Sequence, residues 1–405
     1  MLLTLVHQAP VGPNPVLWQL PHPLAITALL VLLGLTFPLR GLILMIIGRK
    51  RGLRPSRASV VFCIVELLLG TALVCLARVS TLGLFIILET YLFCILAAKG
   101  IDCYLYAKSR QWRFFVPAAA ITACGTQLLL LLLAAPPVQK QRILLVIAVL
   151  MLAVFGASML CDLLFFLVKS SRFRRIVNNI RIALPDYVSL PLLLHVSDAA
   201  CAEPLASVPP DTVEVLFQVS PRGIGMAGHC ELCIDGRTLT YGCYEPGSRR
   251  FFRSMGRGVV FRAPREAYLG WMIHANQKKI VSYVLRFPPE QMQMIRQQLA
   301  QLERNMERWL PQESGEEFVT RLQQVPQVEF YRLTGGPFRT YFVPTINCVT
   351  ITNSILARTE LGNARMPGVR TPGAYMDMLD RQYRSGSRVI IDRRVYGEKE
   401  EARSV

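Results

Sequence analysis

The pattern of apolar and polar positions divides the chain into two parts. Residues 1–168 consist of long apolar runs and contain only four acidic residues, Glu66, Glu89, Asp102 and Asp162. From about residue 172, shorter apolar stretches alternate with polar positions, as in a globular domain of roughly 230 residues, which is ample for one core. The sequence therefore predicts a membrane domain followed by a globular domain.

Five apolar segments of the first part are long enough to cross a bilayer, which needs about 20 residues. We expect an α-helical transmembrane bundle of about five spans over residues 23–168, although four or six spans also fit. Residues 1–22 form an N-terminal tail that prolines interrupt, unlike a cleavable signal peptide. The expected spans are residues 23–48, 60–78, 82–98, 114–135 and 143–168.

The net charge of +18 changes this picture in one respect, because basic residues gather after the first, third and fifth expected spans. The positive-inside rule then places the N-terminus outside and the globular domain on the cytoplasmic side of the membrane. Residues 169–210 form a basic juxtamembrane linker that meets anionic headgroups. The globular part has no finger or RNA-binding signature, so the predicted partner is the lipid bilayer and not nucleic acid.

Three of the acidic residues, Glu66, Glu89 and Asp162, lie inside expected spans. Intramembrane carboxylates are candidates for function by default. We favour a structural role, in which they pair with one another or with Arg78, because no transporter-like repeat accompanies them.

Residues 211–382 are expected to form an α+β domain. Apolar and polar positions alternate over residues 211–219, and a hairpin follows in which Asp235-Gly236 makes the turn. Residues 383–405 are expected to be a charged, loosely ordered tail. Strands are expected at 211–219, 228–234, 238–244, 259–261 and 280–287, and helices at 288–309, 348–359 and 371–379, the last capped by Thr371.

Cys348 is the most informative candidate for chemistry, because it stands where a loop meets the first turn of a helix. Helix N-terminal N–H groups and the helix macrodipole both favour a thiolate. His229, on a strand after a glycine-rich loop, is the candidate base for this nucleophile. Asn347 can supply a side-chain donor, and the backbone N–H groups of the helix start can form an oxyanion hole. Glu231, Asp235 and Glu245 remain alternatives for the group that orients the imidazole.

Two other motifs favour plainer interpretations. Gly223-Ile-Gly225-Met-Ala-Gly228 matches a dinucleotide-binding loop, but such a loop must open a helix, whereas a strand follows here. Cys230 and Cys233, with His229 and Cys243, suggest zinc, yet alternation along a strand points these two cysteines to opposite faces. We therefore predict no cofactor and no metal. The eleven cysteines form no evident disulfide framework, which fits a reducing compartment.

The order of these motifs carries a family resemblance. Gly228-His229 on an early strand and Asn347-Cys348 at a helix start resemble the circularly permuted, papain-like thiol enzymes related to the NlpC peptidases. Over about residues 210–380, Glu329-Phe-Tyr, Asn347-Cys-Val-Thr and Thr371-Pro372 are similar to the bacterial family that contains the Lnb-type lipoprotein N-acyltransferase periplasmic domain. The resemblance implies a permuted papain-like fold, with Cys348 as nucleophile and His229 as base of an acyl-enzyme mechanism.

The resulting expectation is a membrane-anchored cysteine hydrolase or acyltransferase of a bacterial inner membrane that acts on an amide or ester at the membrane surface. Its globular domain is expected on the cytoplasmic side, with the periplasm as the alternative. Its catalytic residues would be Cys348 and His229, with Asn347 and Glu231 in support. The membrane tether favours a lipid, a lipidated protein or a membrane-proximal peptide as substrate. The alternative is a non-catalytic membrane protein whose papain-like domain is a binding or regulatory module.

Overall fold

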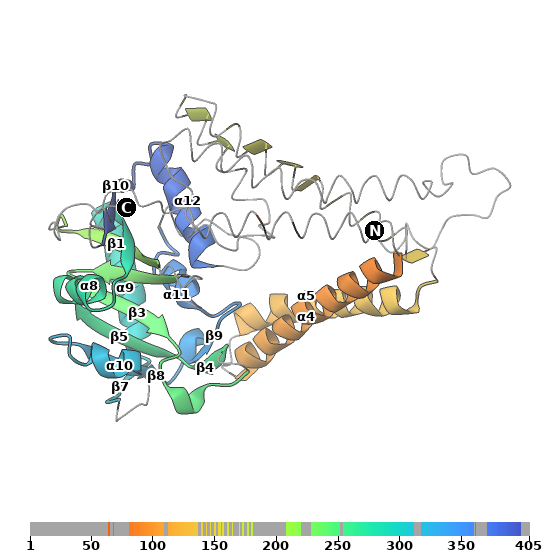
Figure 1. Ribbon diagram of the computed structural model, residues 1–405, viewed down its shortest axis with the longest axis horizontal. Helices are drawn as coiled ribbons and strands as arrows, with labels where there is room; N and C mark the ends of the chain where they lie inside the picture. Colours follow the sequence, from red (N-terminus) through yellow and green to blue (C-terminus); the bar gives the residue numbers. More distant parts are fainter. Residues whose placement is uncertain are drawn as a thin grey trace, which may run out of the picture.

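The structure is a computed structural model of the chain. It describes residues 81–108, 112–136, 208–219, 228–251, 254–311, 317–359, 361 and 371–397, together with scattered positions between residues 64 and 180. These residues form a domain built on a β-sheet and a long helical pair that projects from it (Figure 1).

The expectation of a five-span transmembrane bundle is wrong for the part of the chain that the structure describes. There, one helical segment, Phe115–Ala134 in α5 (Trp112–Ala134), is long and apolar enough to cross a membrane. The expected third span lies within α4 (Thr81–Lys108), whose last turns pack against the sheet domain, where Asp102 and Leu105 are buried. The expected fourth span corresponds to α5, whereas the first, second and fifth fall outside the described residues or on scattered positions among them.

Helices α4 and α5 pack along each other. A side chain at Gly125 would meet the Leu96 Cδ2 atom at 2.5 Å, so glycine permits the close approach of the two helices. Glu89 forms an ion pair with Lys140, with 3.2 Å between the carboxylate oxygen and Nζ. Arg78, a partner that the sequence suggested for these carboxylates, lies outside the described residues. The outer surface of the pair is apolar and exposed, at residues that include Phe93, Trp112, Val116, Ile121, Leu130 and Leu133.

An eight-stranded sheet in which every ladder is antiparallel forms the centre of the second part, in the order β10-β6-β1-β2-β3-β5-β8-β7 (Figure 1). A separate pair, β4 and β9, adjoins it. The strands are β1 (Thr212–Val219), β2 (His229–Ile234), β3 (Arg237–Gly242), β4 (Met255–Arg257), β5 (Val259–Pro264), β6 (Lys279–Arg286), β7 (Met306–Arg308), β8 (Glu329–Leu333), β9 (Thr340–Phe342) and β10 (Ile390–Tyr396).

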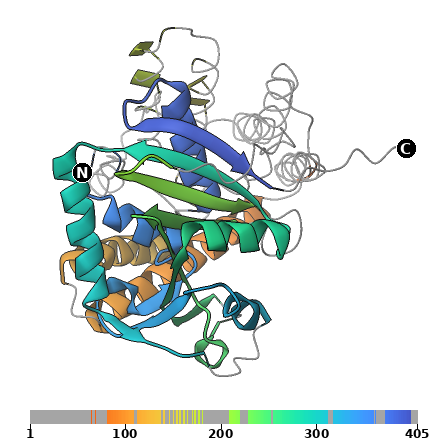
Figure 2. The same cartoon turned by 90° about the vertical axis from the view of Figure 1, so that its left-hand side faces the viewer.

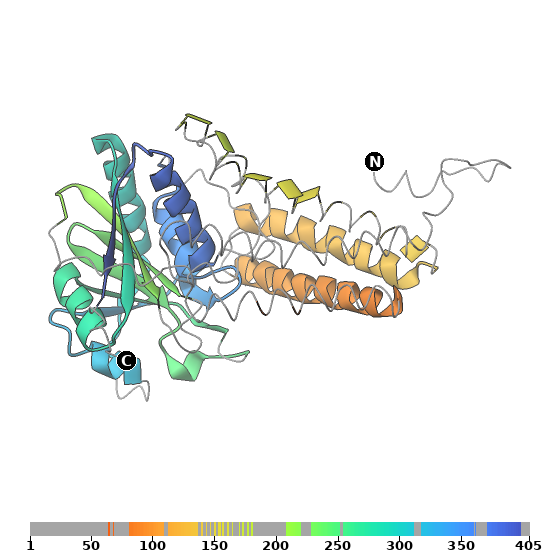
Figure 3. The same ribbon diagram turned by 45° about the horizontal axis from the view of Figure 1, so that its top comes forward.

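Helices cover both faces of the sheet, so its strands are buried on two sides (Figure 2). On one face, α8 (Arg265–His274) and α10 (Glu317–Leu322) enclose a core that includes Leu216 and Cys233. On the other face, α9 (Pro289–Glu303), α11 (Cys348–Ile355) and α12 (Pro372–Arg384) enclose a larger core with Phe217, Cys230 and Cys348. The alternation of side chains along β1 and β2 supplies both cores. Figure 3 shows α11 and α12 on the side of the sheet that faces the α4–α5 pair.

Several local predictions are confirmed. The hairpin of β2 and β3 turns at Asp235 and Gly236, which both have positive φ, 49° and 73°, as a two-residue turn of this kind requires. Thr371 caps α12 by accepting a hydrogen bond from the Ala374 N–H.

Two predictions at helix and domain ends are wrong. The helix expected to reach residue 309 ends at Glu303, and strand β7 follows it. The charged tail expected from residue 383 instead contains β10, which pairs with β6 along the edge of the sheet. Strand β10 buries Ile390 and Tyr396, and the burial of this apolar face favours a strand in spite of the charged positions beside it.

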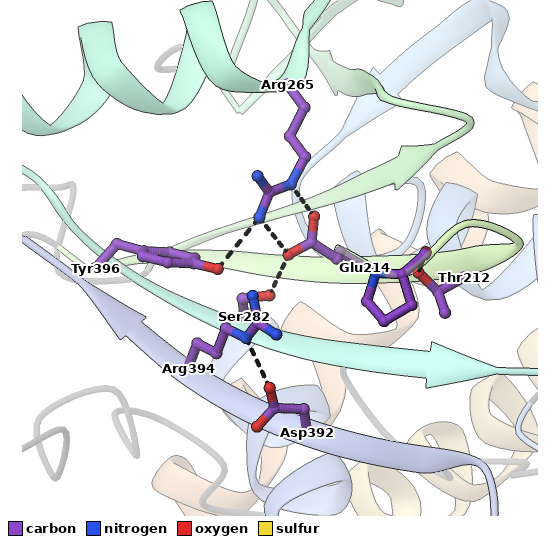
Figure 4. Close-up of polar contacts among 8 residues, drawn as sticks. Thr212, Glu214, Arg265, Ser282, Asp392, Arg394 and Tyr396 are labelled. Atoms are coloured by element: carbon purple, nitrogen blue, oxygen red, sulfur yellow. Dashed lines mark hydrogen bonds and ion pairs between the residues drawn. The ribbon is translucent and has the colours of Figure 1, made fainter. Parts of the chain in front are cut away.

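A buried ion pair ties four elements together (Figure 4). Arg265 of α8 donates from Nε and Nη2 to both carboxylate oxygens of Glu214 of β1. Glu214 also accepts a hydrogen bond from Ser282 Oγ of β6 at 2.7 Å, and Arg265 donates to the hydroxyl of Tyr396 of β10 at 3.2 Å. The network is fully buried, and it joins α8 to the three strands at one edge of the sheet.

Candidate thiol site

Cys348 is the first residue of α11, as the sequence predicts. Asn347 caps the helix, because its side-chain oxygen accepts hydrogen bonds from the N–H groups of Val349 at 3.0 Å and Thr350 at 3.1 Å. The Thr350 hydroxyl in turn accepts a hydrogen bond from the Asn347 N–H at 2.6 Å. This reciprocal capping box fixes the start of the helix, and with it the position of the thiol.

The amide of Asn347 is engaged at both ends. Besides capping the helix through its oxygen, it donates from Nδ2 to the Val343 carbonyl at 2.9 Å. The sequence suggested Asn347 as a donor to an oxyanion. In the structure this amide also positions Cys348, because it joins the preceding loop to the first turn of α11.

The thiol lies where two strands of the sheet part. The ladder between β2 and β3 joins residues 232–234 to 237–239 and then stops, although both strands continue to His229 and Gly242. Helix α11 packs against both strands. The backbone N–H groups of Cys230, Val349 and Cys348 itself are directed at the Cys348 sulfur and lower the pKa of its thiol. The separation of the strands thus frees a strand N–H for the sulfur.

Burial has the larger effect on this thiol. Cys348 is only 2% exposed, and burial raises its pKa to about 11 in spite of the three N–H groups. The thiolate that the helix start favours is therefore not the resting form, because loss of hydration costs the charged sulfur more than these donors restore. At neutral pH the thiol is protonated.

Alkylation of Cys348 by iodoacetamide should therefore rise about tenfold per pH unit from near pH 7 to near pH 10, because the thiolate fraction grows in this proportion below the pKa. Mass spectrometry of the Cys348 peptide measures the rate. Exposed Cys94 of α4 is alkylated in the same sample and serves as the internal control for the amount of active reagent. A Cys348 rate that levels off below pH 8 would contradict the raised pKa.

His229 lies on the opposite face of β2 from the thiol. Its Nε2 atom is 3.4 Å from the Tyr244 hydroxyl, whose ring packs on Phe261 in the core under α8 and α10. Cys230, the next residue of the strand, points into the other core together with Cys348. Among the hydrogen bonds of the described residues, none joins Cys348 to His229. Burial lowers the pKa of His229 to about 4, so the imidazole is neutral at physiological pH.

Glu231 is buried on the same face as His229, but it does not bind the imidazole. Its Oε1 atom accepts hydrogen bonds from Gln218 Nε2, from Thr240 Oγ1 at 3.0 Å and from the Tyr268 hydroxyl. Its Oε2 atom is buried and has no hydrogen-bond partner among the described residues. Burial raises the pKa of Glu231 to about 7, although its three hydrogen bonds lower it.

The other two candidate orienting groups bind arginines. Asp235 pairs with Arg296 at 2.8 Å, and Glu245 pairs with Arg332 at 2.5 Å. The described contact of His229 is instead with Tyr244, which the sequence did not single out. From strand alternation, one could have predicted which face of β1 carries Gln218 and which face of β2 carries Glu231. The antiparallel register that brings them together is not readable from either segment alone.

The structure describes both cysteines of the Cys230–Cys233 motif and the last glycine of the glycine-rich motif. Cys230 and Cys233 point into different cores, as strand alternation predicts. No cluster of three or more histidine, cysteine or acidic side chains suited to a metal occurs among the described residues. Gly228 leads directly into strand β2 with a φ of 72°, and the preceding residues 220–227 lie outside the described part.

The surroundings of Cys348 thus combine a buried thiol with backbone N–H groups, and His229, the candidate base, lies on the opposite face of β2. No family model, no curated protein and no solved structure matches the chain.

Proposed function

We propose that the chain is a cysteine hydrolase or acyltransferase that attacks an amide or ester at a membrane surface, with Cys348 as the nucleophile. One observation carries the proposal: three backbone N–H groups are directed at the Cys348 sulfur where β2 and β3 part. Fixed N–H groups around a sulfur lower the cost of its negative charge, and donors of this kind also stabilise the oxyanion of acyl transfer.

The proposed reaction has two half-reactions, and in each of them one bond to the acyl carbon forms and another breaks. The thiol gives up its proton, the sulfur bonds to the acyl carbon, and the carbonyl oxygen takes the negative charge. The bond to the amine or alcohol then breaks, and the leaving group takes a proton. Water or an amine attacks the thioester in the second half, and the sulfur regains a proton.

His229 is the proposed base, since its neutral imidazole can accept the proton. In the structure it is hydrogen-bonded to Tyr244 across the sheet from the thiol. Catalysis therefore requires the ring to turn towards the opening between β2 and β3. His229 is the first residue of β2 and follows Gly228, so fewer ladder partners hold it than hold the middle of the strand. Catalytic hydrogen bonds are often long before substrate binds.

The apolar helix α5 supports action at a bilayer surface. Its large exposed apolar side chains suit lipid, and α4, its neighbour, packs against the loop before Cys348. A lipid, a lipidated protein or a membrane-proximal peptide are the proposed substrates, in keeping with the resemblance to the NlpC-related and Lnb-type families. Placement of the domain on the cytoplasmic side of a bacterial inner membrane remains a prediction.

Incubation of the full-length protein with p-nitrophenyl butyrate tests the proposal. Cys348 should become butyrylated, with release of p-nitrophenolate, and hydroxylamine should reverse the modification. Cys348→Ser should abolish the modification of that peptide, whereas Cys233→Ser, which alters a buried cysteine in the other core, should leave it unchanged. Modification that persists elsewhere in the chain while Cys348 stays free would refute the role of Cys348.

A non-catalytic binding or regulatory module is the second candidate. The specific observation in its favour is that the thiol is buried, protonated and hydrogen-bonded to no histidine among the described residues. If Cys348 remains unmodified by the ester although the folded protein is alkylated there at high pH, this second function is the better one.

A further inference from the structure

The helical pair contacts the sheet domain at the loop that carries the candidate nucleophile. Leu105, near the end of α4, is buried against Phe342 and Ile346. These two residues bracket a tight turn, in which the Phe342 N–H donates to the Ile346 carbonyl at 2.9 Å and the Ile346 N–H donates back at 2.8 Å. The turn ends directly before Asn347 and Cys348.

A buried carboxylate fastens the same turn. Asp102 of α4 is 1% exposed, and its Oδ1 atom accepts a hydrogen bond from the hydroxyl of Thr345. Its Oδ2 atom pairs with Lys99 Nζ at 3.0 Å, one turn earlier on the same helix. The two residues that bond across this contact are 243 positions apart in the sequence.

The contact continues without a break to the sulfur. Thr345 lies inside the turn, the Val343 carbonyl of that turn holds the Asn347 amide, and Asn347 caps the helix that begins at Cys348. Each link is a hydrogen bond or a peptide bond, so an unbroken series of contacts joins α4 to the first turn of α11.

We infer that Asp102 is a positioning residue for Cys348: through Thr345, it makes the geometry of the thiol depend on the docking of the α4–α5 pair. The inference rests on the proposed function only for its effect on acyl transfer. The coupling itself concerns the thiol and its loop. A bilayer that holds the apolar pair would thereby hold the nucleophile in place.

Four variants of the full-length protein in detergent micelles separate this role from general instability. Asp102→Ala removes the acceptor, and Thr345→Val removes the donor at nearly constant shape. Asp102→Asn keeps an oxygen that can accept from Thr345, while it loses the charge and the pair with Lys99. Glu89→Gln breaks the Lys140 pair elsewhere in the helical part and serves as the matched control.

The readout is the iodoacetamide alkylation rate of Cys348 relative to that of Cys233, at high pH. Asp102→Ala and Thr345→Val should raise this ratio about fivefold, as expected when a loop loses one buried hydrogen bond. The rate of Cys348 butyrylation should fall in the same variants. Asp102→Asn and Glu89→Gln should leave both rates close to those of the wild type.

Two results would overturn the inference. Equal acceleration at Cys348 and Cys233 in Asp102→Ala and Thr345→Val would mean that these substitutions only unfold the domain. An unchanged ratio in both would mean that the contact does not position the thiol. A ratio that rises in a protein whose Cys348 the ester never modifies supports the coupling and rejects only the proposed acyl transfer.

Discussion

Arg265→Met is expected to lower the free energy of unfolding by about 3–5 kcal/mol, the range for removing one partner of a buried ion pair. The arginine donates to both carboxylate oxygens of Glu214, and both residues are almost completely buried. Without the guanidinium, the Glu214 carboxylate keeps the Ser282 hydroxyl but loses its counter-charge in a site that water does not reach. Urea unfolding of the full chain, followed by tryptophan fluorescence, measures the loss.

Two further variants show that the cost comes from the unpaired charge. Arg296→Met breaks exposed pairs with Asp211 and Asp235 and should cost less than about 1 kcal/mol. The double variant Glu214→Leu with Arg265→Met removes both charges and should recover much of the stability. If Arg265→Met costs no more than Arg296→Met, the buried network is not the fastening between α8 and the sheet that its geometry indicates.

Glu231→Gln is expected to make the free energy of unfolding rise between about pH 4.5 and pH 6.5, a range in which that of the wild type changes little. Burial raises the pKa of Glu231 from 4.5 to about 7, so the folded chain binds this proton more tightly than the unfolded chain. The protonated carboxyl therefore contributes about 3 kcal/mol to the free energy of unfolding below pH 4.5. This contribution is lost as the pH rises through 7. Glutamine keeps an oxygen for the three donors and does not titrate.

His229 acts in the opposite sense over much of the same range. Burial lowers its pKa from 6.5 to about 4, so its contribution is present above pH 6.5 and is lost as the pH falls through 4. The two terms largely cancel in the wild type. In Glu231→Gln, stability should therefore rise from pH 4.5 to pH 6.5. Urea titrations at several pH values test this, with exposed Glu266→Gln as the control that keeps the wild-type profile.

The predictions that succeeded concern elements whose signals lie close together in the sequence. The hairpin of β2 and β3 was predictable because its signals, alternating side chains and a two-residue Asp-Gly turn, are local. The start of α11 was predictable for the same reason, since Asn347 and Thr350 cap it within one turn. Strand β10 was missed because its charged positions conceal a short apolar face that only β6 completes.

In the candidate site, too, local features were predictable from the sequence and features that depend on distant residues were not. Position in the chain placed Cys348 at a helix start, where N–H groups surround the sulfur. The thiolate expected there is absent because residues from α9, α12 and the sheet, distant in sequence, bury the sulfur. The predicted pairing of Cys348 with His229 rested on the order of these two residues along the chain. Strand alternation sends the side chains of His229 and Cys230 to opposite faces of β2, and Cys348 packs on the same face as Cys230.

The sequence by itself thus determined the local elements: the β2–β3 hairpin, the capped helix that begins at Cys348, the separation of Cys230 from Cys233, and the apolar character of α5. These depend on neighbours within a few positions. Only the tertiary structure decided the strand order, the helix that fastens the Cys348 loop, the partners of Glu231 and the protonation of the thiol. Strand register and burial bring distant residues together, and the energy of a buried charge depends on that whole environment.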